Sequence, residues 1–315
     1  MDLTKLLDDI SDLNKPASNA RLAQLSGITR DEAKQVRDRW RSWPPKRRRD
    51  MVDKLIDLTE DNTELDFNQL FQRLLDDEDA EVRANAIMGL WECDERPLME
   101  PLIRLLIKDP EEHVRATAAQ ALGRFCILSE TGKLLPRDKD RLARVLFGVI
   151  DLETETTEVR RRAIEAIGPL SLPRVAEIIS DAYEVGGGTM RVSAVFAMGK
   201  TASPDWLPIL LEEIRSEDAE MRYEAVIALG EIGEEDTALD VATLVDDPDS
   251  SVQGAAITAL GSIGGATSKI LLRRLIKSED ALISELAEAA LNSTEFEDEP
   301  PRLVPPYRRT PPSLN

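Results

Sequence analysis

Hydrophobic positions recur along this chain with the period of an α-helix, and polar residues occupy the positions between them. In the stretch "EMRYEAVIALGEIG", residues 220–233, apolar residues fall at offsets 0, 4, 7 and 8 from the first of them and share one arc of a helix: Met221, Ala225, Ala228 and Leu229. The residue at offset 5 is also aliphatic and widens this arc. Such a wide apolar arc indicates a helix that neighbours contact on several sides.

The stretch recurs along the sequence, and each copy is marked by an arginine that follows an apolar residue. Related copies read "HVRATAAQALGRF" and "EVRRRAIEAIGPL". The marker arginines are Arg83, Arg115, Arg160, Arg191 and Arg222, and the frame continues at Gln253 and Ser284. Successive intervals are 32, 45, 31, 31, 31 and 31 residues. A period of this length is typical of helical hairpins stacked many times.

Each copy also supplies the parts of a complete hairpin. A first helix such as "DWLPILLEEIRS" and a polar turn such as "DDPDS" precede the marker. A glycine follows the apolar arc and is expected to end the second helix in the left-handed conformation, at Gly123, Gly168, Gly199, Gly230 and Gly261. Since one hairpin cannot bury its own apolar face, we predict an all-α chain: an α-solenoid, a right-handed superhelix of about seven hairpins.

This repeat resembles the HEAT-like repeat family, of the form D-P-x-x-x-V-R-x-x-A-x-x-A-L-G, which is also found in phycobilin lyase subunits. "DPEEHVRATAAQALG" and "AEMRYEAVIALG" are its best instances, and the resemblance covers residues 66–292. It implies a fold and no particular activity. It further implies that the marker arginines bond acidic or carbonyl groups at the turns, as a structural ladder of Arg83, Arg115, Arg160, Arg191 and Arg222.

The pattern divides the chain into three regions. Residues 1–65 form a helical leader with a basic hairpin, residues 66–293 hold the repeats, and residues 294–315 form a proline-rich tail that is disordered or polyproline-like. In the last repeat, Glu285 and Glu288 enter where the marker arginine is lost, which predicts a polar cap on the stack. An insertion at residues 126–139 is either a binding loop or a linker without a role.

Composition adds that the chain is acidic and globular. Forty basic against sixty acidic residues give a formal charge of -20, which repels phosphate backbones. The amino-terminal stretch is acidic and amphipathic, and no apolar run reaches the ~20 residues of a membrane helix. We therefore expect a cytoplasmic protein with no membrane partner.

Candidate catalytic groups are scarce in this sequence. His113 is the single histidine and falls at the start of a second helix, where a surface position is expected. A di-iron site like that of the HEAT-repeat enzyme deoxyhypusine hydroxylase is excluded, because it needs several His-Glu pairs.

Cys93 and Cys126 are expected to be buried free thiols. Neither "TGK" nor "GGGTM" has the spacing of a phosphate-binding loop. We predict no metal and no cofactor.

One basic cluster could bind anions. It lies in the leader, where Arg47, Arg48 and Arg49 follow a helix that carries further basic residues, and Trp40 and Trp43 stand beside it. A groove that reads a duplex needs positive charge along its length, and the repeats are acidic. Nucleic acid is therefore disfavoured. We expect the leader to dock on the acidic remainder or on an acidic partner protein, and the tryptophans to lie in the core.

The second helices are expected to line the concave side of the stack. At the positions that point into this groove, small and charged residues give way to an apolar patch in repeats four and five, formed by Val192, Phe196, Tyr223 and Ile227. Arg161, Arg162 and Glu224 flank it as polar contacts. These side chains either pack on each other or hold a partner, and Leu303, Val304 and Tyr307 of the tail could cover them.

Three functions remain open from the sequence. The first is a non-catalytic scaffold that binds a peptide or helix of another, unidentified protein in its groove. The second, prompted only by the resemblance to phycobilin lyase subunits, is a bilin lyase or chaperone-like activity. The third is nucleic-acid binding through the basic leader. The sequence favours the first.

Overall fold

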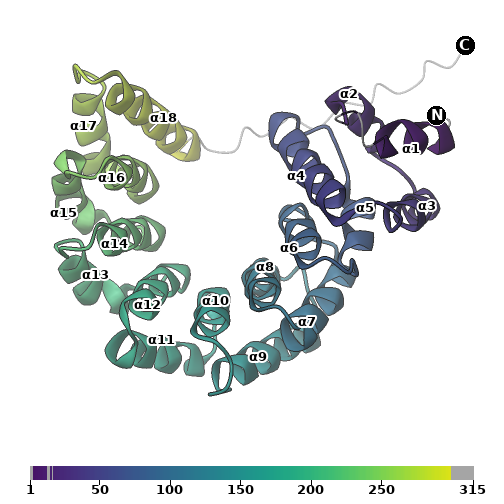
Figure 1. The fold of residues 1–315 in the computed structure, drawn as a ribbon. Helices are drawn as coiled ribbons and strands as arrows, with labels where there is room; N and C mark the ends of the chain where they lie inside the picture. The colour runs from purple at the N-terminus through teal and green to yellow at the C-terminus, as the bar shows by residue number, and fades with distance from the viewer. Residues whose placement is uncertain (1–2, 13–14, 16, 299–315) are drawn as a thin grey trace, which may run out of the picture. The chain divides into compact units, whose positions relative to one another are not determined.

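The computed structural model describes residues 3–12, 15 and 17–298 of the 315-residue chain, with side chains as far as Thr294. This part contains eighteen α-helices and no β-strand, and the helices follow one another as antiparallel pairs (Figure 1). The prediction of an all-α solenoid of stacked helical hairpins is thereby confirmed. The tail residues Leu303, Val304 and Tyr307 lie outside the described residues.

Two compact units make up the chain, residues 1–201 (unit 1) and residues 202–315 (unit 2). The leader of unit 1 consists of α1 (Leu3–Ser11), α2 (Asn19–Leu22), α3 (Arg30–Trp40) and α4 (Pro45–Asp61). Helix α3 begins at a capping box in which Thr29 and Glu32 bond each other's backbone N–H. Both predicted core tryptophans are buried, with the rings of Trp40 and Trp43 5.3 Å apart.

The remainder of unit 1 is four hairpins: α5 (Asn68–Leu74) with α6 (Ala80–Met88), α7 (Met99–Lys108) with α8 (Glu112–Glu130), α9 (Pro136–Ile150) with α10 (Thr157–Ile167), and α11 (Pro173–Val185) with α12 (Gly188–Lys200). Each second helix packs on the next second helix, so α4, α6, α8, α10 and α12 form one layer (Figure 1). The first helices form the other layer. We call the side of the second-helix layer that faces away from the first helices the second-helix face of unit 1.

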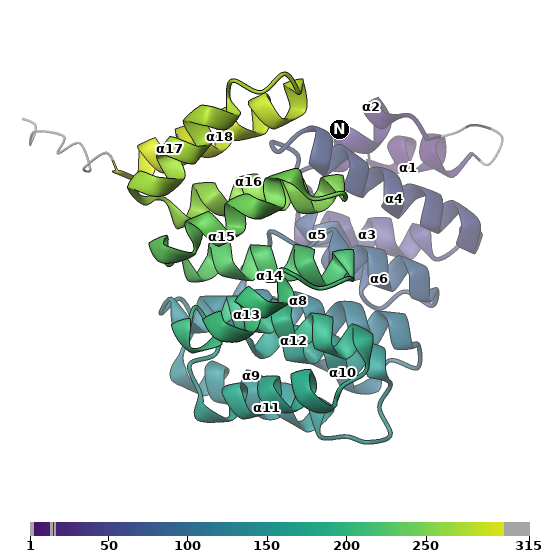
Figure 2. The same ribbon diagram turned by 90° about the vertical axis from the view of Figure 1, so that its left-hand side faces the viewer.

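Unit 2 continues the same plan with three hairpins: α13 (Leu207–Glu213) with α14 (Ala219–Ile232), α15 (Ala238–Ala242) with α16 (Ser250–Ile263), and α17 (Gly265–Leu275) with α18 (Ala281–Asp298). Short 3-10 turns precede or extend several first helices in unit 2. Figure 2 shows α14, α16 and α18 stacked one above another, with α18 tilted relative to α14. Helix α18 continues through the first residues of the expected tail, and the two expected cap carboxylates, Glu285 and Glu288, are exposed on it.

The recurring glycine has a different role from the one expected. Gly230 and Gly261 lie inside their helices, and a Cβ at Gly230 would lie 2.9 Å from the Cα of Ala259 on the next second helix. A Cβ at Gly123 would likewise meet Ala166, and one at Gly168 would meet Ala197. The glycine therefore lets consecutive second helices approach closely, and the prediction of a left-handed helix end was wrong for it. In α14 that end falls at Gly233, where φ is 75°.

The insertion is largely helical. Its first residues extend α8 to Glu130, and α9 begins at Pro136. Two ion pairs hold the turn between these helices: Arg96 donates both Nε and Nη2 to the carboxylate of Asp138 at 2.6 Å, and Lys139 contacts Glu130 at 2.6 Å. The segment is therefore an extension of the hairpin that is fixed at both ends.

Candidate functional site

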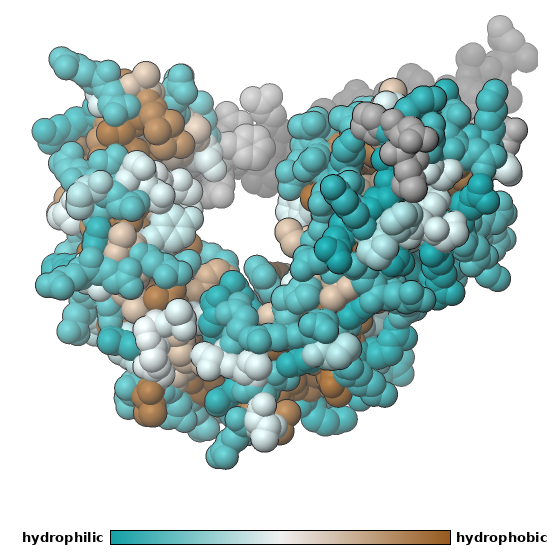
Figure 3. All heavy atoms as spheres, viewed as in Figure 1, coloured by the Kyte–Doolittle hydropathy of each residue, from teal (hydrophilic) through white to brown (hydrophobic). Residues whose placement is uncertain are grey.

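An apolar pocket opens on the second-helix face of unit 1. Its volume is about 430 Å3, and it lies where α4, the end of α6 and α8 meet. We call it the Trp91 pocket; it is lined by residues of all three elements, among them Ile56, Glu60, Met88, Trp91, Gln120 and Arg124. Hydrophilic residues cover most of the unit 1 surface seen in Figure 3, so a cluster of apolar side chains at a pocket is unusual there.

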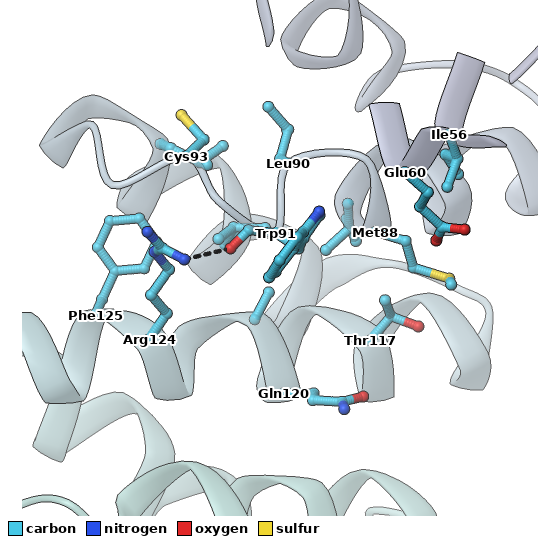
Figure 4. A pocket seen from close by; sticks show the side chains of 14 residues that line it. Ile56, Glu60, Met88, Leu90, Trp91, Cys93, Thr117, Gln120, Arg124 and Phe125 are labelled. Atoms are coloured by element: carbon cyan, nitrogen blue, oxygen red, sulfur yellow. Dashed lines mark hydrogen bonds between the residues drawn. The ribbon is translucent and has the colours of Figure 1, made fainter. Parts of the chain in front are cut away.

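Two large apolar side chains in this pocket are left open to solvent. Trp91 is 62% exposed and Met88 is 53% exposed. In Figure 4, Met88 and Glu60 lie on one side of the indole of Trp91, and Arg124 and Phe125 lie on the other. Exposing an indole to water forfeits the free energy of its burial, about 25 cal/mol per Å2 of apolar area, unless a partner covers it.

The local sequence explains why Trp91 points outward. Helix α6 ends at Met88, earlier than the equivalent second helices, and the chain crosses the ring of Phe71 at Gly89. A Cβ at Gly89 would lie 2.5 Å from Cζ of Phe71, so only glycine fits there. Arg124 of α8 then holds the loop by donating to the carbonyl oxygens of Trp91 at 2.7 Å and Glu92 at 2.8 Å (Figure 4).

Negative charge borders the pocket on the side of α4. Asp50, Asp53, Asp57 and Glu60 recur every three or four residues and are all exposed, so they form one row along this helix. Asn85 of α6 donates to the carboxylate of Asp53. Partial burial raises the pKa of Asp53, and repulsion from Asp50, Asp57 and the nearby Glu81 of α6 raises it further. We call these four residues the acidic row.

The cysteines are poor nucleophiles. Cys93 lines the Trp91 pocket and Cys126 lies within α8, and both are buried free thiols, as predicted. Burial raises the pKa of both thiols, which disfavours the thiolate that nucleophilic chemistry needs. Neither thiol is therefore a candidate nucleophile.

The apolar patch expected in repeats four and five is divided between the two units. In unit 1, Val192 is only 6% exposed, and Phe196 is half-buried beneath the ammonium of Lys200, 4.9 Å from its ring centroid. In unit 2, Tyr223 is 36% exposed and Ile227 is half-buried. Val192 thus offers little surface to a partner, and the most exposed large apolar side chains of the second-helix face, Trp91 and Met88, lie at the Trp91 pocket.

The polar residues expected to flank that patch already have partners. Arg161 donates to Glu158 at 2.9 Å and Arg162 to Glu165 at 2.9 Å, and the hydroxyl of Ser193 donates to Glu165 at 2.6 Å. The first two contacts lie within α10, and the third joins α12 to α10 within unit 1. Glu224, on α14, is half-buried and also takes part in a contact.

Three marker arginines bond the turns of two consecutive repeats at once. Arg83 donates Nε and Nη2 to Asp109 of the next turn at 2.7 Å, and Nη1 to the carbonyl oxygens of Asp77 and Glu78 in its own turn. Arg115 forms the same arrangement with Glu155, and Arg222 with Asp247. Planar, bidentate geometry of this kind suits arginine and fixes the spacing of the hairpins.

The other marker positions make contacts of different kinds. Arg160 donates to the carbonyl oxygen of Ile150 at 2.9 Å, and the guanidinium of Arg191 lies over the ring of Tyr183. Gln253 donates to the carbonyl oxygen of Asp247, and Ser284 to that of Ile276. The residues that replace arginine thus keep the bond to a turn carbonyl of their own hairpin.

The basic residues of the leader are engaged inside unit 1. Arg48 is buried and bonds Asp77 at 2.9 Å, which extends the arginine contacts one hairpin toward the amino terminus. Arg49 forms a bidentate pair with Asp79, and Arg47 donates to the carbonyl oxygen of Ile10 at 2.6 Å. The structure thus gives the three candidate anion-binding residues intramolecular partners, and Arg48 in particular has no surface for an external anion.

Other candidate sites can be described briefly. His113 is exposed at the start of α8 with Nε2 3.7 Å from Glu81, at the surface position predicted for it. Among the described residues, no three His, Cys, Asp or Glu side chains gather as metal ligands would. Within the same ranges, every helix is too short or too polar to cross a bilayer.

Comparisons with known proteins agree with this architecture. The family model for HEAT repeats matches residues 67–146, 186–243 and 207–292, which together make up more than half of the chain. No curated protein matches the sequence. Among solved structures, the Kap95:Nup1 complex is similar at 14% identity with a TM-score of 0.50, over 93% of this chain and 46% of that chain.

Two further solved structures are similar at lower TM-scores. CpcE and CpcF of phycocyanin lyase from Nostoc sp. PCC7120 share 17% identity over 72% of this chain and 94% of that chain, with a TM-score of 0.46. Human deoxyhypusine hydroxylase in complex with glycerol shares 17% identity over 85% and 97%, with a TM-score of 0.38. At such identities these likenesses concern the fold alone.

Proposed function

Because the chain belongs to the HEAT-repeat family, we propose that it acts without catalysis, as a scaffold that binds a peptide or helix of another protein. The binding surface is the second-helix face of unit 1, with the Trp91 pocket at its centre. Trp91 and Met88 are the apolar anchors of this surface, and Gln120 and Thr117 supply polar contacts beside them.

The observation that carries this proposal is the exposure of Trp91 beside an apolar pocket of about 430 Å3. Tryptophan is among the residues that contribute most to binding free energy in protein interfaces, and it does so where a pocket excludes water around it. The other three tryptophans of the chain, Trp40, Trp43 and Trp206, are buried. A chain that buries every other indole and exposes this one supports a role for Trp91 outside the core.

The other two functions gain less support. Bilin chemistry was suggested by the repeat resemblance, and a TM-score of 0.46 to the phycocyanin lyase subunits adds no argument for it. Binding of nucleic acid through the leader needs free cations, whereas Arg47, Arg48 and Arg49 bond groups of unit 1. A phosphate backbone would also meet the acidic row.

The test compares partner capture by variants of the full chain. Trp91→Ala and Met88→Ser are each expected to lose the same proteins, namely those that the wild-type chain retains from its native host. Helix content measured by circular dichroism should stay unchanged in both variants. Ile107→Ala is the matched control, because Ile107 is 54% exposed on α7 in the first-helix layer of unit 1. Retention of the same proteins by Trp91→Ala, or equal loss with Ile107→Ala, would remove the proposal.

A further inference from the structure

We propose that the segment held at the Trp91 pocket is basic: a stretch of another protein in which a large apolar side chain is accompanied by several lysines or arginines. This inference rests on the proposed function and adds the chemistry of the partner to it. The apolar side chain enters the Trp91 pocket, and the cations lie along the acidic row of α4. The pocket supplies apolar contact area and the row supplies selectivity by charge.

The charges around the pocket favour this occupant. Glu60 is at once a lining residue of the pocket and the last member of the acidic row. In the part of the chain that the structure describes, no member of the row forms an ion pair, whereas Arg48 and Arg49 at the start of the same helix are paired with Asp77 and Asp79.

The groups that face the pocket from the other elements do not neutralise the row. Arg124 is the lining cation on α8, and its two Nη atoms are already directed to the carbonyl oxygens of Trp91 and Glu92. Glu81 of α6 adds a further negative charge next to Asp53. A partner cation placed here would relieve repulsion among the carboxylates as well as pair with them.

The dimensions limit the length of the partner segment. Asp50 and Glu60 stand ten residues apart on α4, a separation of about 15 Å at 1.5 Å per residue. A helix of about three turns, or about five residues of extended chain, spans that distance. One apolar anchor with two or three cations on the same face therefore fits the whole surface.

The experiment uses two labelled synthetic peptides of about four helical turns, one built from leucine and lysine and one from leucine and glutamate at the same positions. Binding to the full chain is followed by fluorescence anisotropy and by the emission of Trp91, which shifts to the blue when the indole is covered. We expect the lysine peptide to bind and to shift the emission, and the glutamate peptide to do neither. Added salt weakens the binding of the lysine peptide.

A matched pair of triple variants separates local from overall charge. Asp50→Asn, Asp57→Asn and Glu60→Gln together remove three charges from the acidic row, and Asp53 is left in place because it bonds Asn85. The control triple is Glu177→Gln, Asp181→Asn and Glu184→Gln, which removes three exposed charges from one face of α11 in the first-helix layer. We expect about tenfold weaker binding of the lysine peptide to the first triple and no change beyond twofold for the control.

Four results would overturn this inference. Equal weakening by both triples would mean that only the net charge of the chain attracts the peptide, and absence of binding would mean that the pocket does not take such a segment. Equal binding of both peptides, lost in Trp91→Ala, would refute the charge preference while the proposed function stands. If Trp91→Ala binds the lysine peptide as wild type does, the proposed function fails with it.

Discussion

Replacing Arg83 by methionine tests whether the arginine contacts hold consecutive hairpins together. The guanidinium makes four hydrogen bonds: two to the carboxylate of Asp109 at 2.7 Å and two to the carbonyl oxygens of Asp77 and Glu78. The side chains of Arg83 and Asp109 are only 10% and 3% exposed, so Arg83→Met leaves a buried carboxylate without a cation. Removing one partner of such a pair costs about 3 to 5 kcal/mol.

The lower end of this range applies here, because Asp109 keeps the bond from the backbone N–H of Glu111 at 3.0 Å. We therefore expect a loss of about 3 kcal/mol, which is a large part of the 5 to 15 kcal/mol that stabilises a typical domain. In a stack of repeats this loss acts locally. Amide exchange in the turns before α6 and α8 should therefore become about 100-fold faster, at unchanged rates in unit 2.

Hydrogen exchange read by mass spectrometry measures this effect. The double variant Arg83→Met and Asp109→Asn should recover about 1 to 2 kcal/mol, because asparagine needs no counter-charge and still accepts the bond from Glu111. A cost below about 1 kcal/mol for Arg83→Met, or no recovery in the double variant, would refute the reasoning that the pair is a buried structural contact.

Two predictions concern unit 2. Gly230→Ala should destabilise unit 2 relative to Gly254→Ala by about 1 to 3 kcal/mol in denaturant unfolding. The reason is that a Cβ at Gly230 would lie 2.9 Å from the backbone of Ala259, whereas a Cβ at Gly254 would meet only the tip of Leu286 at 3.7 Å. Equal stabilities of the two variants would contradict the close approach of α14 and α16. The hydrogen bonds from Arg222 lower the pKa of Asp247, so this pair stabilises the folded state above the pKa of an unfolded aspartate, about 3.9, and the contribution is lost as the pH falls through the lower folded value. Acid unfolding of unit 2 below pH ~4 should therefore be shallower in Asp247→Asn than in wild type, and superimposable acid curves would rule this linkage out.

Much of the fold could be predicted because the same pattern of buried positions recurs in several copies of the repeat. The apolar arc of residues 220–233 is buried as its spacing indicates, with Ala225, Ala228 and Leu229 inside. The role of the recurring glycine was predicted wrongly because a residue without a side chain suits either of two situations: a left-handed turn or a close approach of two helices. Sequence position alone does not separate these, and only the neighbouring helix shows that Gly230 meets Ala259.

The candidate site could be predicted only in part. Met88 is the last residue of α6, whereas Trp91 falls after the helix has ended, so the direction of its side chain does not follow from helical periodicity. The signal was present in the repeat frame: Trp91 stands eight residues after Arg83, at the position where later copies have the recurring glycine. The expected patch failed to stand out for a tertiary reason, since Lys200 covers Phe196 and the neighbours of Val192 bury it.

Photocrosslinking from position 91 in the native host tests the central claim most directly. A photoreactive phenylalanine analogue replaces Trp91 in one form of the full chain and Tyr223, an exposed aromatic residue of unit 2, in another. We predict that position 91 captures a discrete protein, joined through a segment that holds an apolar residue among lysines or arginines, and that position 223 does not capture it. Capture of the same protein from position 223 alone, with none from position 91, would contradict the account.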